Sequence, residues 1–224
     1  MAPAQAPRFE RIGEDCLLLR FDARIDAAGN ARVHALASRL RSTRPDWVVD
    51  IVPAFASVAV FIDLDGRCEG DPLHAAEAWM ETQASHPEPH IAPGRTIEIP
   101  VRYGGAGGAD LDEVAAHAGM QADEVIARHS APEYSVAMLG FAPGFPYLLG
   151  LDPAIAIPRR ATPRLRVPAG SVGIGGVQSG IYPRTGPGGW RLIGRTEATL
   201  FDPLRDPPAL LAPGDRVRFV PVTS

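Results

Sequence analysis

The chain has 224 residues, of which 46% are hydrophobic and 21% charged, and its formal net charge is −4. These values are typical of a globular protein with one or two domains, and the acidic balance gives no electrostatic reason to expect nucleic acid or an anionic membrane as a partner. All 22 basic residues are arginine, which excludes a P-loop lysine, a Schiff-base lysine and a biotin attached to this chain.

The first 90 residues predict the order strand, strand, helix, strand, strand, helix. The apolar runs RFERIG and CLLLRF flank turn residues, as in a β-hairpin. Apolar residues at helical spacing predict a helix that begins near Asp26, and the pair Asp71-Pro72 is a typical start for a second helix. Between them, WVVDIVP and SVAVFID are rich in β-forming residues. We expect a small α/β domain in which a sheet packs against two helices.

The stretch SHPEPHIAPG, residues 85–94, predicts a domain boundary because its three prolines can continue neither a helix nor a central strand. We therefore divide the chain into domains 1–90 and 91–224. His86 and His90 are four residues apart, but the prolines between them prevent a shared helix face, and we expect no metal site there.

After the boundary, RTIEIPVRY predicts a strand and GGAGGAD a loop that ends on an aspartate. Two short helices follow, at DLDEVAAHAG and ADEVIARHS. From EYSVAMLGF onward, Gly and Pro interrupt short apolar runs every 8 to 12 residues or so, which predicts a small β-barrel or sandwich.

Residues 167–190, VPAGSVGIGGVQSGIYPRTGPGGW, contain eight glycines and three prolines. The stretch completes neither a phosphate-binding loop, nor a dinucleotide fingerprint, nor a serine-hydrolase elbow. Two interpretations remain: the glycines form barrel corners at positive φ, or they bring the backbone close to a small-molecule ligand. Four arginines nearby form either a solvated strand face or a rim for a carboxylate or phosphate: Arg159, Arg160, Arg164 and Arg166.

Three segments closely resemble the family of allophanate hydrolase subunit 1: MLGFAPGFPYLLGLD, residues 158–196 and LLAPGDRVRF. That family includes the B subunit of 5-oxoprolinase and KipI-like inhibitors of a histidine kinase, and it matches the first half of the carboxyltransferase domain of urea carboxylase. The resemblance covers essentially the whole chain. It implies an α+β fold, with a small N-terminal α/β domain of ferredoxin-like type followed by a cyclophilin-like β-barrel domain.

The resemblance also implies a function as the B subunit of an ATP-dependent 5-oxoprolinase, which opens 5-oxo-L-proline to L-glutamate. Such a protein works with the A and C subunits of the enzyme, of which the C subunit is of the allophanate hydrolase subunit 2 type, and ATP is used with those partners. Two alternatives remain open: a histidine-kinase inhibitor, and a carboxyltransferase-type subunit of urea or allophanate metabolism with biotin on another chain.

Under the first reading we expect a substrate groove lined by residues of the barrel. A carboxylate of the substrate would suit the arginine fork of Arg160 or Arg195, with Gln178 and Tyr182 as catalytic hydrogen-bond donors. His129 is either a catalytic proton carrier near pH 7 or a core or capping histidine. The other residues expected to bind substrate are Ser171, Gly188 and Trp190.

The cysteines and the N-terminal sequence bear on the compartment. Cys16 and Cys68 lie far apart without metal-type spacing, so we expect two reduced thiols. The first residues have neither the basic nor the apolar region of a secretion signal, and no apolar run reaches the roughly 18 residues of a membrane span. We expect a cytoplasmic protein.

Overall fold

The computed structural model describes residues 7–21, 26–65, 70–86 and 94–223. The chain divides into two compact units, Met1–Ala92 and Pro93–Ser224. The boundary predicted between residues 90 and 91 lies outside the described residues, as do Cys68 and His90. Cys16 is a buried free thiol.

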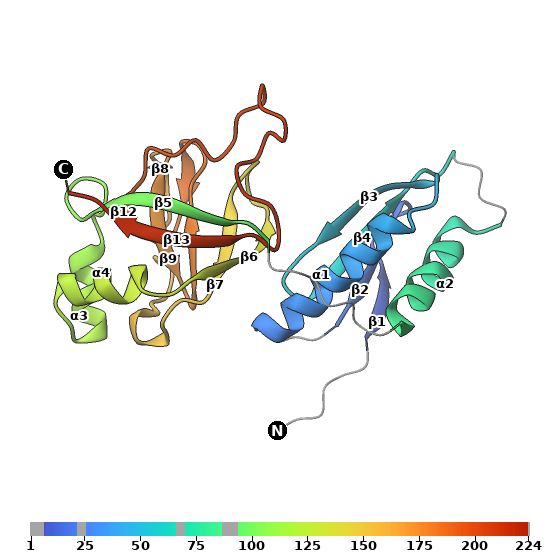
Figure 1. Ribbon diagram of the computed structural model, residues 1–224, viewed down its shortest axis with the longest axis horizontal. Helices are drawn as coiled ribbons and strands as arrows, with labels where there is room; N and C mark the ends of the chain where they lie inside the picture. Colours follow the sequence, from blue (N-terminus) through green and yellow to red (C-terminus); the bar gives the residue numbers. More distant parts are fainter. Residues whose placement is uncertain (1–6, 22–25, 66–69, 87–93, 224) are drawn as a thin grey trace. The chain divides into compact units, whose positions relative to one another are not determined.

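The first unit is a four-stranded antiparallel sheet with two helices, in the order of elements that the sequence predicts (Figure 1). Its strands run in the order β1-β2-β4-β3, and β1 occupies the edge that the last strand holds in a ferredoxin-like sheet. The elements are β1 (Arg8–Arg11), β2 (Cys16–Arg20), α1 (Ala27–Ser42), β3 (Val48–Pro53), β4 (Ser57–Ile62) and α2 (Pro72–Ser85).

Both helices begin where the sequence predicts. The carboxylate of Asp26 accepts a hydrogen bond from the Gly29 N–H, and that of Asp71 accepts one from the Leu73 N–H. The apolar face of α1 and the buried face of α2 pack against the sheet in one core, which includes Leu17, Leu36, Val60 and Met80.

The second unit is a closed seven-stranded barrel with the strand order β10-β7-β6-β13-β5-β12-β9 (Figure 1). Its strands are β5 (Thr96–Tyr103), β6 (Tyr134–Leu139), β7 (Pro146–Leu149), β9 (Ser171–Gly175), β10 (Gln178–Ile181), β12 (Arg191–Arg195) and β13 (Arg216–Pro221). All neighbours are antiparallel except β5 and β13, which run parallel over six residue pairs. The mixed α+β fold with a barrel is therefore confirmed.

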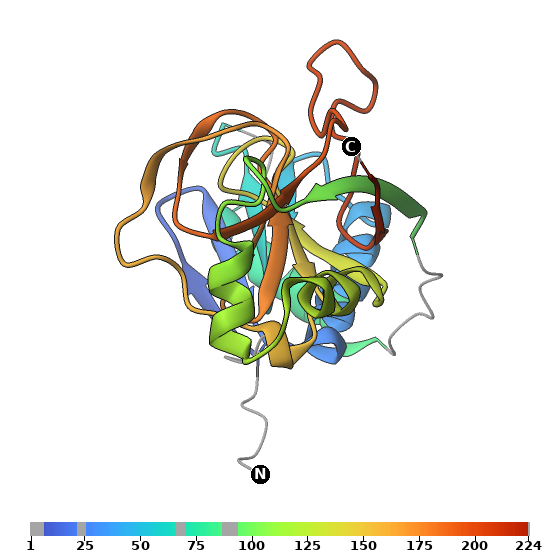
Figure 2. The ribbon, with the colours of Figure 1, turned by 90° about the vertical axis from the view of Figure 1, so that its left-hand side faces the viewer.

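The remaining elements lie around the barrel. The predicted helices α3 (Leu111–Ala118) and α4 (Ala122–Ser130) lie side by side against one end of it (Figure 2). A short 3-10 helix, η1, spans Pro153–Ile155, and β8 (Arg164–Val167) pairs with β11 (Gly186–Gly188) as a separate ribbon. Among the helices of the described residues, none is long and apolar enough to cross a membrane.

Side chains along β9 alternate between the inside and the outside of the barrel, as strand geometry requires. Val172 and Ile174 belong to the barrel core, together with Ile99, Val136 and Phe219. The intervening positions, Ser171, Gly173 and Gly175, consequently face outward. This outer face carries most of the residues that the sequence singles out.

Candidate functional site

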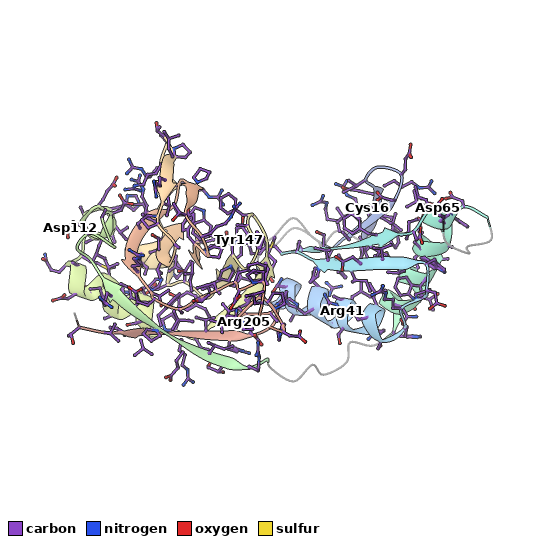
Figure 3. The ribbon with its side chains drawn as sticks, turned by 90° about the horizontal axis from the view of Figure 1, so that it is seen from above. Cys16, Arg41, Asp65, Asp112, Tyr147 and Arg205 are labelled. Carbon is purple, nitrogen blue, oxygen red and sulfur yellow. The ribbon has the colours of Figure 1, made fainter. Side chains whose placement is uncertain are left out.

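An aromatic layer covers the outer face of β7, β10 and β9. Phe145 lies 5.2 Å from Tyr182 and 5.5 Å from Trp190 between ring centroids, all edge-to-face, and Tyr147 lies 5.8 Å from Trp190. Figure 3 labels Tyr147 among the side chains of the barrel unit. The buried members of the layer are Ala142, Phe145, Val167, Tyr182, Trp190 and Leu192.

Glycines on the strands make room for this layer. A Cβ at Gly175 would lie 2.6 Å from the indole of Trp190, and one at Gly180 would lie 2.8 Å from the same ring. At Gly188 it would collide with the phenol of Tyr182. Gly175 and Gly188 therefore serve close approach, but to aromatic side chains of the same chain. The corner interpretation holds for Gly170 and Gly176, whose φ values are 79° and 67°.

Gly175→Ala is expected to lower the free energy of unfolding by about 1–3 kcal/mol, because the added methyl group overpacks a filled layer. Chemical denaturation measures the loss, and near-UV circular dichroism reports the displaced indole. Gly186→Ala is the matched control, since a Cβ there meets nothing within 4 Å. Equal stability of the two variants would show that Trp190 does not fill this space.

Phe141 extends the aromatic layer to the surface. Its φ of 65° is the one positive value among the non-glycine residues that the structure describes, and a bulky side chain rarely adopts it. The ring is largely exposed and lies 5.4 Å from Phe145. Strain of this kind persists only where surrounding structure holds it, and it concentrates at functional sites. No local sequence signal marks Phe141, because its backbone conformation is visible only in the fold.

Gln178 is the first residue of β10 and pairs with Gly175, the residue that Trp190 covers. Its side chain faces outward, because the next residue, Ser179, bonds to a histidine inside the barrel. The amide is buried, yet within the described part of the chain its Nε2 has no hydrogen-bond partner. A buried amide left unpaired is unfavourable, so this donor needs a functional or structural explanation.

Asp110, in the loop before α3, holds two of the four clustered arginines. Its carboxylate accepts hydrogen bonds from Arg164 at 2.6 and 2.8 Å, from Arg160 at 3.3 Å and from the Leu192 N–H at 2.7 Å. Burial alone would raise the pKa of Asp110, but the bonds from Arg164 and Leu192 and the charge of Arg160 outweigh it, and the pKa is lowered.

The sequence left the arginine run as either a solvated strand face or an anion-binding rim, and this ion cluster gives Arg160 and Arg164 a different role. Arg160 and Arg164 are partly buried against Asp110, and Arg159 lies over the ring of Trp190, 5.4 Å from its centroid. Arg160 and Arg164 thus anchor structure, Arg159 is exposed with its guanidinium over an aromatic ring, and Arg166 is exposed without a described partner. The backbone N–H of Arg160 also bonds to the Gly189 carbonyl, which keeps Arg160 beside Trp190.

His129 lies apart from these residues, fully buried in the barrel core on α4. Its Nδ1 is 2.8 Å from the hydroxyl of Tyr103 and its Nε2 is 2.8 Å from that of Ser179. Burial lowers the pKa of His129 to about 3, so the ring is neutral at pH 7. This environment favours the core histidine over the proton carrier.

Ser171 and Arg195 lie at the opposite end of β9 from Gly175. They face each other across the β9–β12 pair, and Ser171 accepts a backbone hydrogen bond from Tyr182 at 2.9 Å. Arg195 lines a surface depression of about 460 Å³. The structure thus gathers five of the eight predicted residues, namely Arg160, Gln178, Tyr182, Gly188 and Trp190. It places Ser171 and Arg195 beside them and His129 inside the barrel.

In the residues that the structure describes, no group of three or more His, Cys, Asp or Glu side chains is placed to hold a metal ion.

Comparison with known proteins identifies the family. A family described as "Carboxyltransferase domain, subdomain C and D" matches residues 7–211. The chain belongs to this family. The match confirms the resemblance to a carboxyltransferase domain that the sequence motifs indicate. It extends over parts of both compact units.

Relatives of this carboxyltransferase-domain chain extend over nearly its whole length. It is 48% identical over 218 residues to the 5-oxoprolinase B subunit of Escherichia coli O157:H7, covering 97% of each chain. It is 41% identical over 223 residues to the 5-oxoprolinase B subunit of Bacillus subtilis (strain 168), covering 96% of this chain and 93% of that one.

A solved structure, that of TTHA0988, is also similar, with a TM-score of 0.79 and 40% sequence identity. The similarity covers 93% of this carboxyltransferase-domain chain and 40% of TTHA0988. TTHA0988 is therefore more than twice as long as the region that the two proteins share.

Proposed function

We propose that this chain is the B subunit of an ATP-dependent 5-oxoprolinase, which opens the lactam of 5-oxo-L-proline to give L-glutamate. The observation that carries the proposal is the 41–48% identity, over nearly the full length, to curated B subunits of 5-oxoprolinase. Opening an unstrained lactam requires activation of an unreactive amide, which ATP supplies in such an enzyme.

Catalysis in this proposal depends on partner subunits. The name of the relatives implies other subunits, and we assign these as the A and C subunits of the enzyme, the second being of the allophanate hydrolase subunit 2 type. The length of TTHA0988 supports such a partnership. The region that it shares with this chain is only 40% of TTHA0988, where it is joined to further sequence in one polypeptide, whereas a partner of this chain would be a separate protein. This chain carries neither a P-loop nor a dinucleotide fingerprint, so in this proposal ATP is used together with the partners. A buried free thiol at Cys16 is consistent with a cytoplasmic complex.

The outer face of the barrel is our candidate for the substrate-facing surface. A lactam presents a carbonyl oxygen, which accepts hydrogen bonds, and Gln178 offers an amide donor without a described partner. Burial raises the pKa of Tyr182, which keeps its phenol protonated as a second donor. Ser171, Gly188 and Trp190 would shape this surface, and Arg160 would contribute positive charge beside it.

Reconstitution tests the proposal. The purified chain with ATP and 5-oxo-L-proline is expected to form no glutamate, and glutamate should appear once the A and C partners have been added. In that complex, Gln178→Met is expected to lower kcat/KM about tenfold, roughly 1.4 kcal/mol of transition-state stabilisation. Its melting temperature should stay equal or rise, since an unpaired buried amide has been replaced by an apolar side chain of similar size.

Gln121→Met is the matched control, because Gln121 is exposed on the same unit and its side chain makes no capping bond. Full activity of the Gln178→Met complex would remove Gln178 from the site. Turnover by the chain alone would contradict partner dependence. A complex that forms no glutamate, but inhibits a histidine kinase or transfers a carboxyl group from biotin, would replace this function by one of the alternatives.

A further inference from the structure

A depression on the barrel surface, distinct from the aromatic layer, combines positive charge with a glycine loop. Its volume of about 460 Å³ falls within the range of small-molecule sites. The wall is formed by Arg102 of β5, the loop 104–107, Arg195 at the end of β12, Glu197 beyond it, and Val222. A smaller depression of about 200 Å³ shares Arg102, Arg195 and Glu197 with it.

The two arginines are direct cross-strand neighbours. Arg195 pairs with Arg102 in the antiparallel β12–β5 register, so both side chains stand on the outer face of the barrel. Like charges directly opposite each other destabilise a sheet. The arrangement would be favourable if an anion lay between the two guanidinium groups.

Within the described residues, neither arginine has all the N–H groups of its guanidinium paired with protein acceptors. The Nε of Arg195 donates to the Ala169 carbonyl at 3.1 Å, which orients the guanidinium and leaves both Nη groups without a described partner. Arg102 has one acidic neighbour, Glu197, at 3.9 Å, and the Glu197 side chain is 75% exposed. A long, solvent-exposed pair of this kind contributes little.

A glycine loop, residues 104–107, forms part of the same wall. Gly104 and Gly105 take φ values of 72° and 55°, and the turn closes as Gly108 N–H bonds to the Gly104 carbonyl at 2.9 Å. A Cβ at Gly107 would lie 2.9 Å from the Cβ of Arg195, so the loop must lie flush against that arginine. Across the described parts of the chain, the N–H groups of residues 105–107 have no hydrogen-bond acceptor.

We propose that this depression binds the oxyanion group of a small molecule, a carboxylate or a phosphate, between Arg102 and Arg195. The planar guanidinium of Arg195 matches two oxygens of such a group, and loop N–H groups add donors as in other turn-built anion sites. The proposal of an oxyanion site is based on the cross-strand pair of arginines and the depression that they line. The choice between its two sources rests on the proposed function, whose substrate carries a carboxylate and whose co-substrate carries phosphates.

Calorimetric titration of the full chain tests the site with three probes: inorganic phosphate, ATP without added metal, and 5-oxo-L-proline. Ionic strength is held constant with potassium chloride, because screening alone weakens surface electrostatics. Saturable binding of at least one probe is expected, and Arg102→Gln and Arg195→Gln should each raise its Kd about tenfold or more, as for loss of a charge-assisted hydrogen bond.

Arg218→Gln provides the matched control. Its side chain is 58% exposed, against 57% for Arg102, and it lies on the neighbouring strand outside the depression. This variant should bind as the wild type does. Binding of 5-oxo-L-proline alone would identify the carboxylate source, and binding of phosphate and ATP the phosphate source.

The proposal would be overturned if no probe bound saturably, or if Arg218→Gln weakened binding as much as the other two variants. Its failure is distinguishable from that of the proposed function, because the titration needs neither a partner protein nor turnover. If the titration succeeds, the oxyanion site is supported even when the complex has no 5-oxoprolinase activity. If the titration fails, the oxyanion site is contradicted even when the complex is active.

Discussion

Asp110→Asn is expected to lower the free energy of unfolding by about 3 kcal/mol at pH 7, since it leaves partly buried guanidinium groups without their counter-charge. The Asp110 side chain is 4% exposed, and it holds Arg160, Arg164 and the start of β12 together. Urea denaturation at pH 7 measures the loss. Asp112→Asn removes the same charge two residues away on the exposed side of α3 (Figure 3) and should change stability by less than about 1 kcal/mol.

The contribution of Asp110 depends on pH in a defined direction. Because its folded pKa is lowered, the stabilisation is present above the pKa of an unfolded aspartate, about 3.9, and is lost as the pH falls through the folded value. Wild type and Asp110→Asn should therefore converge in stability at strongly acidic pH. Equal stability of the two proteins at pH 7 would contradict the role of the ion cluster.

Acid is expected to destabilise the barrel through His129. Its pKa is about 6.5 in the unfolded chain and about 3 in the fold, so below pH 6.5 the unfolded state alone binds the proton. Between pH 6.5 and about pH 4 this linkage should lower the free energy of unfolding by about 3 kcal/mol, at 1.36 kcal/mol for each pH unit. Denaturation across this range measures the slope.

His129→Gln should flatten that slope, whereas His117→Gln, at an exposed position of α3, should leave it unchanged. If the His129 variant does not fold, the wild-type protein still decides the matter. NMR should then show the His129 ring as neutral down to about pH 4. A ring that titrates near pH 6.5 would contradict its burial and would restore the proton-carrier prediction.

Local signals in the sequence were sufficient for the elements. Asp26 and Asp71 cap the helices that they predict, and the spacing of Gly and Pro predicts the short strands of the barrel. The glycine-rich stretch was also identified as unusual for a physical reason, since several of its glycines must lack a Cβ. Trp190, which occupies the space over Gly175, is only fifteen residues further along the chain.

The site required contacts between distant residues, which no local pattern contains. Asp110 appeared in the sequence only as the end of a glycine loop, because its partners Arg160, Arg164 and Leu192 lie 50, 54 and 82 residues away. The burial of His129 depends on Tyr103 and Ser179, which come from two different strands. The Arg102–Arg195 pair likewise exists only once β5 and β12 are paired.

The parallel pairing of β5 with β13 has a consequence for synthesis of the chain on the ribosome. β13 joins β5, starting with Thr96 beside Arg216, and it also pairs with β6. Until Arg216–Pro221 has left the ribosome, β5 and β6 each present an unpaired edge, which is the feature of nascent sheets most prone to aggregate. The first unit has all its strands within residues 8–62 and can complete its sheet earlier. A nonsense mutation between residues 196 and 215 would accordingly leave an open sheet rather than a shortened barrel.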